Sequence, residues 1–358
     1  MRYAIDPDIA SARTLPGSFY SDADAFAASR DKVFARSWQW IGELKDVASL
    51  QSLSPRNLLP GVLDEPLLLA RDAQGTLRCL SNVCTHRGNI LVAKPCSAKE
   101  IRCGYHSRRF DLAGRMTFMP EFKAAKDFPS LSDDLPRVEL GQWGGHGFAS
   151  LDPAAPFDEV FADVREAMAR APVAQFAHEP SRDRDYEIRA HWALYVENYL
   201  EGFHIPFVHE GLNAVVDYGG YRSEIYRWSN VQLANTKDGA PAAQYWWIFP
   251  NLMLNFYPWG LSLNLVEPLA IDRTRVRFRC FVGDAAKLGE GAGASLDRVE
   301  AEDEAIVQAV QRGVRSRLYT RGRYSPSHEQ GVHHFHRLLT QALMASETSR
   351  MSARSKEP

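Results

Sequence analysis

The sequence has few cysteines and no surplus of charge of either sign. Only five cysteines occur in 358 residues, and they are too scattered for a disulfide-stabilised scaffold. We therefore expect reduced thiols or metal ligands, and a cytoplasmic protein. The 42 basic residues are balanced by 44 acidic residues, which leaves no basic excess to bind a nucleic-acid backbone.

Three further signals are missing. The N-terminal segment carries Asp6 and Asp8 and has no apolar core, so no secretory signal peptide is predicted. The glycine-rich stretch 289–294 lacks the GxGxxG spacing, and no flavin or nicotinamide site is predicted. Residues 240–266 contain no charge and are long enough to cross a bilayer. Their three prolines and short aromatic pieces instead favour two or three buried strands joined by turns, and no membrane partner is expected.

What is present is typical of a soluble globular protein of one large or two smaller domains, with 45% hydrophobic and 24% charged residues. Residues 40–152 are rich in glycine, proline and short apolar runs, which predicts an all-β region. Apolar and basic residues alternate over 275–280, as in a half-buried strand. Three segments have helical patterns: about 22–38 with Ser21 or Asp22 as its cap, 157–170, and about 295–319.

Two short Cys-His arms form the first constellation. Cys84 and His86 are separated by one residue, Cys103 and His106 by two, and 16 residues lie between the arms. Each arm supplies one cysteine and one histidine, whereas a Cys2His2 zinc finger draws each pair from one arm. The pattern suits a two-iron, two-sulfide cluster with the cysteines on one iron and the histidines on the other. A zinc site, or unrelated residues in β loops, is the alternative.

A carboxylate and two histidines form the second constellation. Glu201 and His204 are three residues apart and would share a helix face. His204 and His209 are five apart, and on an unbroken helix they would point ~140° from each other. Pro206 lies between them and would break the helix so that both can bind one metal. Two histidines and one carboxylate keep positions open on Fe(II) for oxygen and substrate. Two separately bonded histidines are the alternative.

The third ligand is predicted on the late helix. At ~100° per residue, Asp303 lies in the middle of an apolar stripe, while Glu302 and Glu304 point to either side toward solvent. Burial of a lone carboxylate is costly unless a positive charge compensates it, and a ferrous ion would do so. An internal salt bridge or a helix-start acid is the alternative. The residues of the stripe are Leu296, Val299, Val307, Val310 and Val314.

Other residues of the same types have no partner at a suitable spacing. Three cysteines are expected as small buried apolar side chains: Cys79, Cys96 and Cys280. Three late histidines are expected at the surface or the edge of the core: His333, His334 and His336.

With these motifs in order along most of the chain, the sequence resembles the catalytic α subunits of the Rieske non-haem iron oxygenases, or ring-hydroxylating oxygenases. The resemblance implies a Rieske [2Fe-2S] cluster on Cys84, His86, Cys103 and His106, and Fe(II) on His204, His209 and Asp303. One departure is the second arm, where Ser107-Arg108 replaces the usual Gly-Trp pair and would alter the surface on which an electron donor docks.

The resemblance also implies how electrons would reach the iron. Within one chain the two centres of the family are too far apart for fast transfer. An acidic residue three positions before the first iron histidine, here Glu201, links the iron to a cluster histidine of a neighbouring subunit in a ring, usually a homotrimer. A separate NAD(P)H-dependent reductase or ferredoxin would donate the electrons. Asn198 would bond near the iron or help to position oxygen.

The implied fold class is α+β: an all-β Rieske domain inserted into a helix-grip catalytic domain, whose antiparallel sheet is backed by a long C-terminal helix. The expected boundaries are an N-terminal helical segment over 1–38 that packs on the catalytic domain, the Rieske domain over 39–153, the catalytic domain over 154–345, and a disordered tail over 346–358.

The expected activity is oxidation of a small organic substrate by O2. Glu201, where many members have Asp, resembles the branch that oxidises choline, carnitine and betaines, by hydroxylation or N-demethylation. Aromatic side chains could surround a quaternary ammonium ion through cation–π attraction: Tyr195, Tyr199, Trp246, Trp247, Tyr257 and Trp259. They would equally suit an aromatic substrate, with hydroxylation or dihydroxylation as the alternative. An electron carrier or an inactive binding protein is the remote alternative.

Overall fold

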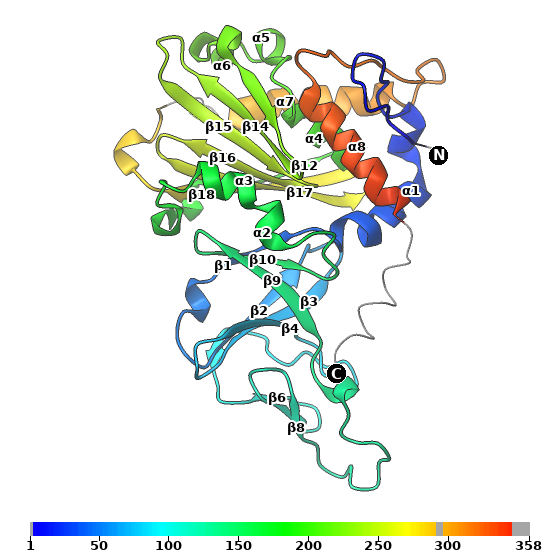
Figure 1. Ribbon diagram of the computed structural model, residues 1–358, viewed down its shortest axis with the longest axis vertical. Helices are drawn as coiled ribbons and strands as arrows, with labels where there is room; N and C mark the ends of the chain where they lie inside the picture. Colours follow the sequence, from blue (N-terminus) through cyan, green and yellow to red (C-terminus); the bar gives the residue numbers. More distant parts are fainter. Residues whose placement is uncertain (1–2, 291–295, 346–358) are drawn as a thin grey trace. The chain divides into compact units, whose positions relative to one another are not determined.

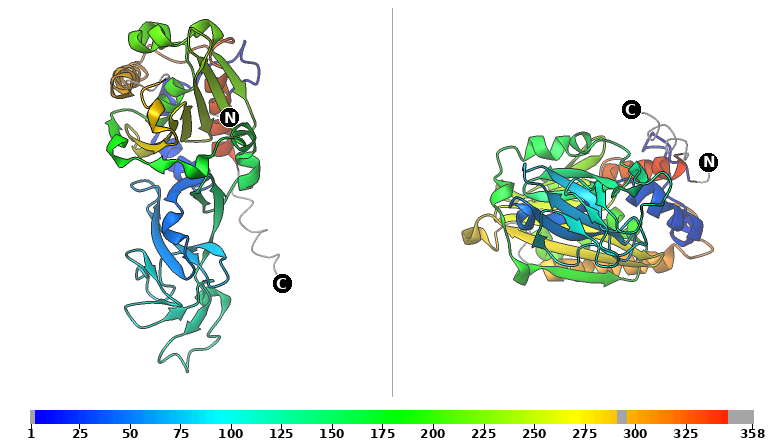
Figure 2. Two further views of the ribbon diagram at one scale, coloured as in Figure 1. Left: turned by 90° about the vertical axis from the view of Figure 1, so that its left-hand side faces the viewer. Right: turned by 90° about the horizontal axis from the view of Figure 1, so that it is seen from below.

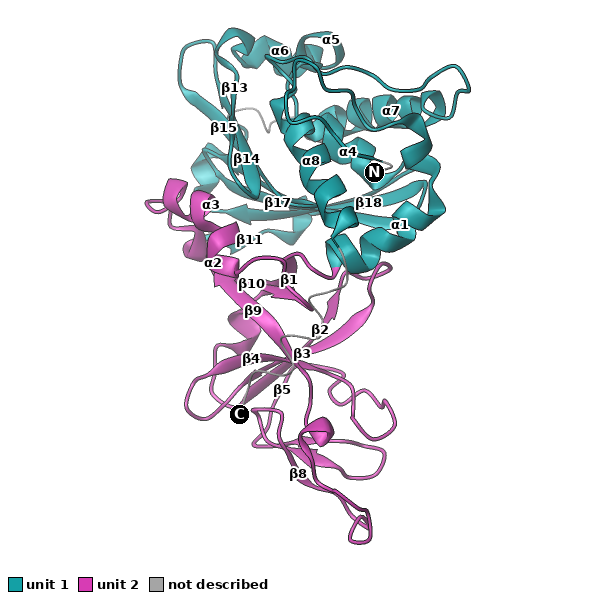
Figure 3. Ribbon diagram, turned by 45° about the vertical axis from the view of Figure 1, so that its right-hand side comes forward, with its two compact units in different colours: residues 1–34, 176–358 teal, residues 35–175 magenta. Residues whose placement is uncertain are grey.

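The computed structural model describes residues 3–290 and 296–345, in two compact units (Figure 3). Unit 1 consists of residues 1–34 and 176–358, and unit 2 of residues 35–175. Residues 154–175, which we expected in the catalytic domain, group instead with unit 2. The expected tail, 346–358, lies outside the described residues.

Unit 2 is built on antiparallel strands, as predicted for its region of the sequence (Figure 1). The larger sheet has the order β1-β10-β9-β4-β3-β2-β5 and the smaller one the order β6-β7-β8. The bounds are β1 Gln39–Glu43, β2 Ser52–Leu58, β3 Glu65–Arg71, β4 Leu77–Ser81, β5 Cys96–Ser97, β6 Ile101–Arg102, β7 Arg109–Phe110, β8 Met116–Phe118, β9 Arg137–Trp143 and β10 His146–Ser150.

Strand β3 is buried on both faces. Leu67 and Leu69 belong to one apolar cluster, and Leu68 and Ala70 to another. Because successive side chains of a strand point to opposite faces, the run of apolar residues fills both layers of the core at once. The second cluster also contains Cys84 and Cys103, so the same packing fixes the ends of both Cys-His arms.

The early helices are shorter than predicted. Helix α1 (Ala23–Ser29) is capped by Asp22, whose carboxylate accepts from the backbone N–H groups of Asp24 and Ala25, and a π-helical turn continues it to Phe34. The helix expected over 157–170 is split into α2 (Phe157–Val160) and α3 (Ala162–Ala167). The break lies at the fully buried Phe161, whose ring stacks on Phe157 at 4.2 Å.

Unit 1 contains an antiparallel sheet with the order β11-β18-β17-β16-β15-β14-β13, and β12 also pairs with β18. The strands, coloured green to yellow, follow one another across one sheet in Figures 1 and 2. The uncharged segment forms β15, β16 and β17, which confirms the strand prediction. The bounds are β11 Ala177–His178, β12 Arg184–Ile188, β13 Arg222–Ile225, β14 Ser229–Asn235, β15 Pro241–Ile248, β16 Leu252–Tyr257, β17 Gly260–Ala270 and β18 Arg273–Val282.

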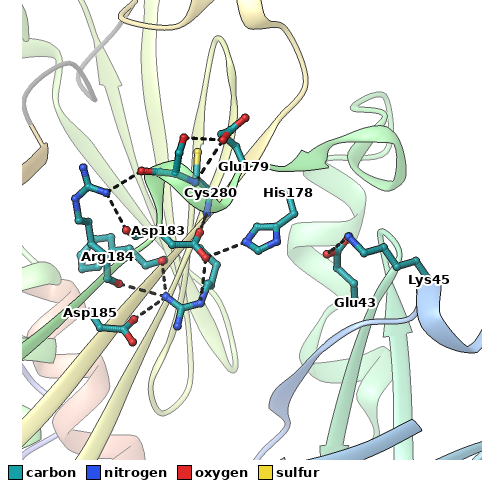
Figure 4. A network of polar contacts seen from close by, with 11 residues as sticks. Glu43, Lys45, His178, Glu179, Asp183, Arg184, Asp185 and Cys280 are labelled. Atoms are coloured by element: carbon teal, nitrogen blue, oxygen red, sulfur yellow. Dashed lines mark hydrogen bonds and ion pairs between the residues drawn. The ribbon is translucent and has the colours of Figure 1, made fainter. Parts of the chain in front are cut away.

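Strand β18 has one apolar and one basic face, as its alternation predicts. Val276, Phe278 and Cys280 are buried. On the other face, Arg279 forms an ion pair with Asp185 at 2.6 Å and lies 3.6 Å from Asp183, a network that Figure 4 shows. Arg275 and Arg277 each lie 2.6 Å from the Glu267 carboxylate of β17, so acids of two neighbouring strands and of the segment before β12 neutralise the basic face.

Five helices complete unit 1: α4 (Trp192–Tyr199), α5 (Ile205–Val208), α6 (Glu210–Val215), α7 (Leu296–Gly313) and α8 (Gln330–Met344). Helix α4 packs against α7, α8 and β17. Helix α7 ends at Gly313, earlier than the predicted Tyr319, and α8 was not identified from the sequence. Helices α8 and α1, distant in sequence, lie side by side (Figures 1 and 2). None of the described helices has the length and apolar character needed to cross a membrane.

Candidate metal centres

The two Cys-His arms fold as matching turns. In the first arm, Gly88 donates its backbone N–H to the Cys84 carbonyl at 2.9 Å, and its φ is +70°. In the second arm, Ser107 donates to the Cys103 carbonyl at 3.1 Å, and its φ is +60°. A left-handed residue four positions after each cysteine folds the arm back and presents its cysteine and histidine together. Glycine adopts this conformation easily, whereas serine does so at a cost.

The four side chains of the arms fit a [2Fe-2S] cluster. Cys84 and Cys103 are both 2% exposed, and the rings of His86 and His106 lie 4.9 Å apart. The Nδ1 atom of His106 is buried and has no hydrogen-bond partner within residues 3–290 and 296–345, as expected of a metal ligand. The Cys103 sulfur accepts the Tyr105 backbone N–H at 3.5 Å. Two thiolates and two neutral imidazoles are the donor set of a Rieske centre.

The ion pair between Arg108 and Asp133 connects the two arms. Arg108, at 2% exposure, donates to the Asp133 carboxylate at 2.6 Å. The Asp133 carbonyl accepts the hydroxyl of Thr85, which lies between the first cysteine and histidine, at 2.7 Å. The Arg108 guanidinium also lies over the rings of Phe110 and Phe128, at 5.7 and 5.6 Å. Because Arg108 is buried, it acts in packing rather than on the docking surface where we expected its effect.

In unit 1, three potential ligands converge on one point. The Nε2 atom of His204 lies 3.1 Å from that of His209 and 3.4 Å from an Asp303 oxygen, and His209 Nε2 lies 3.1 Å from the same oxygen. Among the described residues, these three form a group that could hold one metal ion. Two imidazoles and one carboxylate on one side of an ion suit ferrous iron.

The backbone reaches this arrangement differently from the prediction. Helix α4 ends at Tyr199, so Glu201 and His204 lie in the following turn and not on one helix face. Pro206 does not break a helix; it occupies the first turn of α5, where the missing N–H is harmless. The short helix α5 ends at Val208, and the next residue, His209, has non-helical φ and ψ of −111° and 78° that return its ring toward His204.

Carboxylates hold the outer nitrogen of each histidine. Glu201 accepts from His204 Nδ1 at 2.6 Å and from the backbone N–H of His204 at 3.0 Å. Glu302 lies 2.8 Å from His209 Nδ1. The Glu302 contact corrects the prediction that this side chain faces solvent. Both bonds hold Nδ1, so that Nε2 of each ring is directed at the metal position.

Asn198 also contacts the candidate carboxylate ligand, since its side-chain amide donates to an Asp303 oxygen at 2.7 Å.

Burial opposes the charge of Asp303, yet hydrogen bonds and charges from the two histidines lower its pKa to about 2. Burial also opposes the charge of His204, but Asp303 and Glu201 raise its pKa to about 9. Three carboxylates around two imidazoles create a negative site that favours a divalent cation.

The inward face of α7 is rotated relative to the predicted stripe. Val307 is buried, but Val310 is 41% exposed. Two polar residues, Glu300 and Gln311, are each 3% exposed and occupy the inward face with Asp303. Gln311 accepts the backbone N–H of His191, the residue that caps α4. The apolar pattern predicted part of this face, since Val307 and Val314 are buried and Val299 lines the cavity, but it did not include the hydrogen-bonded polar side chains beside them.

A cavity adjoins the metal position. Its volume is about 110 Å³, which is room for several waters or one small substrate. Five tyrosines line it: Tyr195, Tyr199, Tyr221, Tyr245 and Tyr257. Burial raises the pKa of each phenol above its usual value, so these rings are neutral.

The set of rings differs from the predicted one. Tyr221 and Tyr245 line the cavity and were not identified from the sequence. Three tryptophans expected there are not among the described lining residues and are buried elsewhere in the core: Trp246, Trp247 and Trp259. Trp247 packs on Phe249, and Trp259 stacks on Tyr257 at 5.1 Å. Aromatic character alone does not tell which strand residues face the cavity.

Among the cysteines and histidines that were not predicted as metal ligands, Cys96 and His336 differ from the expected burial. Cys96 is exposed, although we expected a buried side chain. His336 is fully buried and packs near α4, where its Nε2 lies 3.0 Å from a Glu197 oxygen and its Nδ1 bonds to the Tyr324 hydroxyl at 2.6 Å. Tyr20 donates to the same Glu197 oxygen at 2.7 Å. These bonds fix the helix that carries Asn198.

Comparison with known protein families gives two matches. Residues 37–129 match the family described as Rieske [2Fe-2S] domain, and residues 220–345 match the catalytic domain of the ring hydroxylating alpha subunit. The chain is 28% identical to chloroplastic choline monooxygenase of Arabidopsis thaliana, over 93% of this chain and 84% of the relative. It is also 28% identical to the carnitine monooxygenase oxygenase subunit of Escherichia coli K12, over 92% and 93% of the two chains.

Solved structures share the fold. The quaternary ammonium Rieske monooxygenase CntA in complex with L-carnitine superposes with a TM-score of 0.76 and 22% identity, over 94% of this chain and 97% of that one. Naphthalene 1,2-dioxygenase from Rhodococcus gives a TM-score of 0.70 and 16% identity, over 93% and 95%. The predicted α+β fold class is thereby confirmed. The chain belongs to the Rieske oxygenases, as an α subunit that combines a Rieske [2Fe-2S] domain with a non-haem iron catalytic domain, and it is an oxidoreductase.

Proposed function

We propose that this chain is the oxygenase component of a monooxygenase that oxidises a quaternary ammonium compound. The observation that carries the proposal is the cavity beside the metal position, lined by five neutral tyrosines and acidic side chains. Electron-rich rings and negative charge attract a cation that cannot donate hydrogen bonds. The relatives named choline, carnitine and glycine betaine monooxygenase act on substrates of this class and support the same reading.

The proposed reaction replaces a C–H bond of a methyl or methylene group by C–OH. One O2 and two electrons are consumed with two protons, one oxygen atom enters the product and the other leaves as water. When a methyl carbon bonded to nitrogen is hydroxylated, the product loses formaldehyde and the amine is demethylated; when a methylene carbon bonded to nitrogen is hydroxylated, the C–N bond breaks and the longer chain leaves as an aldehyde. A separate reductase supplies the electrons from NAD(P)H.

Each group of residues has a proposed role. Cys84, His86, Cys103 and His106 would hold the Rieske cluster, which stores one electron at a time. His204, His209 and Asp303 would hold ferrous iron, whose open positions allow O2 activation. The chain itself positions these groups: Glu201 orients His204, Asn198 holds the Asp303 carboxylate, and the tyrosines keep the substrate cation and exclude water.

We further propose that three subunits form a ring and that electrons cross each subunit boundary through Glu201. Two exposed aromatic surfaces support an interface. Phe207 is 80% exposed and Phe203 42% exposed, on either side of His204. Tyr105 is 57% exposed and its ring covers that of His106 at 3.7 Å. Exposed rings beside both centres are suited to burial against another subunit.

The low cysteine content agrees with a cytoplasmic location.

The test uses chemically reduced protein, so that it does not depend on the unidentified reductase. Anaerobically reduced enzyme loaded with iron is mixed with O2 and either choline, L-carnitine or glycine betaine, and products are identified by mass spectrometry. We expect a hydroxylated or demethylated product with at least one of these compounds, and no turnover with NADH alone until a reductase is added. Product from benzoate or naphthalene, with none from the ammonium compounds, would contradict the proposal.

A further inference from the structure

The acidic side chain of Glu300 lines the cavity but does not bond to either candidate metal histidine. Glu300 lies on α7, one turn before Asp303, and lines the cavity at 3% exposure. One of its oxygens accepts the Tyr195 hydroxyl at 3.0 Å. The other oxygen is buried and has no hydrogen-bond partner among the described residues. Since buried polar groups are almost always paired, this oxygen indicates a missing partner.

Apart from the two metal histidines, the ionisable groups on the aspartates, glutamates, lysines and arginines that line the cavity are all acidic. Three carboxylates line it: Glu201, Glu300 and Asp303. Glu201 and Asp303 are occupied by the histidines, which leaves Glu300 as the acid available to a ligand. No lysine or arginine is among the lining residues in the part of the chain that the structure describes.

Resting on the proposed function, we infer that Glu300 is the counter-ion of the substrate's quaternary ammonium group and selects a substrate with a net positive charge. A substrate that also carries a carboxylate would find no lysine or arginine among the described lining residues and would bring its negative charge close to Glu300. The favoured class is therefore an alcohol or alkyl quaternary ammonium cation rather than a zwitterionic betaine.

The physical basis is the cost of a buried charge. A quaternary ammonium group has no N–H, so only coulombic and cation–π attraction can hold it. Burial, reinforced by the charge of Asp303, raises the pKa of Glu300 well above its usual value. The ionised form becomes favourable when a cation occupies the cavity beside the unpaired oxygen. The tyrosine rings supply the remaining attraction without adding a competing hydrogen-bond donor.

The experiment compares Glu300→Gln with wild type by isothermal titration calorimetry on iron-loaded, oxidised protein. The probes are choline, its neutral isostere 3,3-dimethylbutan-1-ol, and glycine betaine. Gln keeps the shape and can still accept from Tyr195. Glu304→Gln, on the same helix but outside the described lining, is the control.

We expect Glu300→Gln to weaken choline binding about 30-fold or more, as when one member of a buried charge pair is removed. Binding of the neutral isostere should change less than threefold, and the wild-type preference for choline over glycine betaine should largely disappear. Iron content and the cluster spectrum should not change, since Glu300 is outside the candidate ligand group.

Two outcomes overturn the inference, and they are distinguishable. Equal choline affinity in wild type and Glu300→Gln, with iron retained, refutes the role of Glu300 while leaving the proposed function intact. Absence of binding or turnover of every quaternary ammonium probe by the wild-type enzyme refutes the proposed function and the inference with it.

Discussion

At the scale of single residues, the bond between Glu302 and His209 illustrates how the metal position is prepared. The carboxylate lies 2.8 Å from Nδ1 and also accepts from Arg298 at 3.0 Å. It fixes the ring orientation and makes the opposite nitrogen a better ligand. Sequence spacing could not reveal this role, because Glu302 is 93 residues from His209 and sits beside the ligand Asp303 on α7.

We predict that Glu302→Gln lowers the affinity for mononuclear iron by roughly 10- to 100-fold, because the neutral amide stabilises the ligating form of His209 less well. Competition with a chelator measures this affinity, and the cluster absorbance serves as an internal reference. The Glu304→Gln variant should behave as wild type. Unchanged iron affinity in Glu302→Gln would mean that the carboxylate has no part in metal binding.

The matching turns of the two cluster arms give a second prediction. Ser107→Gly should raise stability by about 1 kcal/mol, since glycine adopts positive φ without strain. The reciprocal Gly88→Ser should lower stability by a similar amount, because serine is strained at positive φ. A steric clash adds nothing, since a Cβ at this position would lie 4.0 Å from Val83, an ordinary contact distance. Thermal bleaching of the cluster absorbance measures both effects. Changes of the same sign in the two variants would show that backbone strain does not govern these positions.

At the scale of elements, helix α7 shows what hydrophobic periodicity can and cannot predict. The existence of the helix and the inward position of Asp303 follow from the pattern. The exact face does not, because Glu300 and Gln311 are buried through hydrogen bonds to groups on and next to α4. Those partners lie more than a hundred residues away, and only the folded chain brings them together.

A matched pair of variants on α7 tests the observed face. Val307→Ala should destabilise unit 1 by about 2 kcal/mol, because two buried methyl groups are lost and a cavity remains. Val310→Ala removes the same groups from a 41% exposed position and should change stability by less than about 0.5 kcal/mol. Chemical denaturation followed by circular dichroism compares them. Equal losses would place both valines in the core and restore the predicted stripe.

Helix α8 and the contacts of His336 near α4 were beyond prediction for another reason. The sequence near His336 contains three histidines and reads as polar. The buried histidine is nevertheless accommodated there, because its Nδ1 bonds to the Tyr324 hydroxyl and the Glu197 carboxylate lies 3.0 Å from its Nε2. By contrast, the cluster arms, the two iron histidines and Asp303 were identifiable as candidates, since their residue types and spacings are unusual. Short motifs can be identified from the sequence, whereas contacts between residues far apart in the sequence cannot.

At the scale of the whole molecule, the two candidate centres belong to separate units of one chain. If electrons cross between subunits as proposed, two different defects can compensate each other in a mixed ring. Cys103→Ala removes a cluster ligand, and His204→Ala removes an iron ligand. Each variant alone should be inactive, with about one iron per chain in the first and about two in the second, as the ligand sets imply.

We predict that rings assembled from both variants recover activity well above that of either variant, because a cluster of one subunit serves the iron of its neighbour. Tagged co-expression and oxygen uptake with choline measure the recovery. A subunit carrying both substitutions, co-assembled with His204→Ala, is the control and should recover nothing. No recovery in verified mixed rings would refute transfer across the boundary.

The discontinuity of unit 1 has a consequence for how the protein is made. Residues 1–34 belong to a body whose remainder begins at residue 176, and Tyr20 and Lys32 bond to Glu197 and to the backbone of Leu343. On the ribosome, the inserted unit emerges whole while this leading segment still waits for its partners. Maturation of the iron–sulfur centre can therefore begin on the nascent chain, whereas the candidate iron site is complete only after translation has passed Asp303.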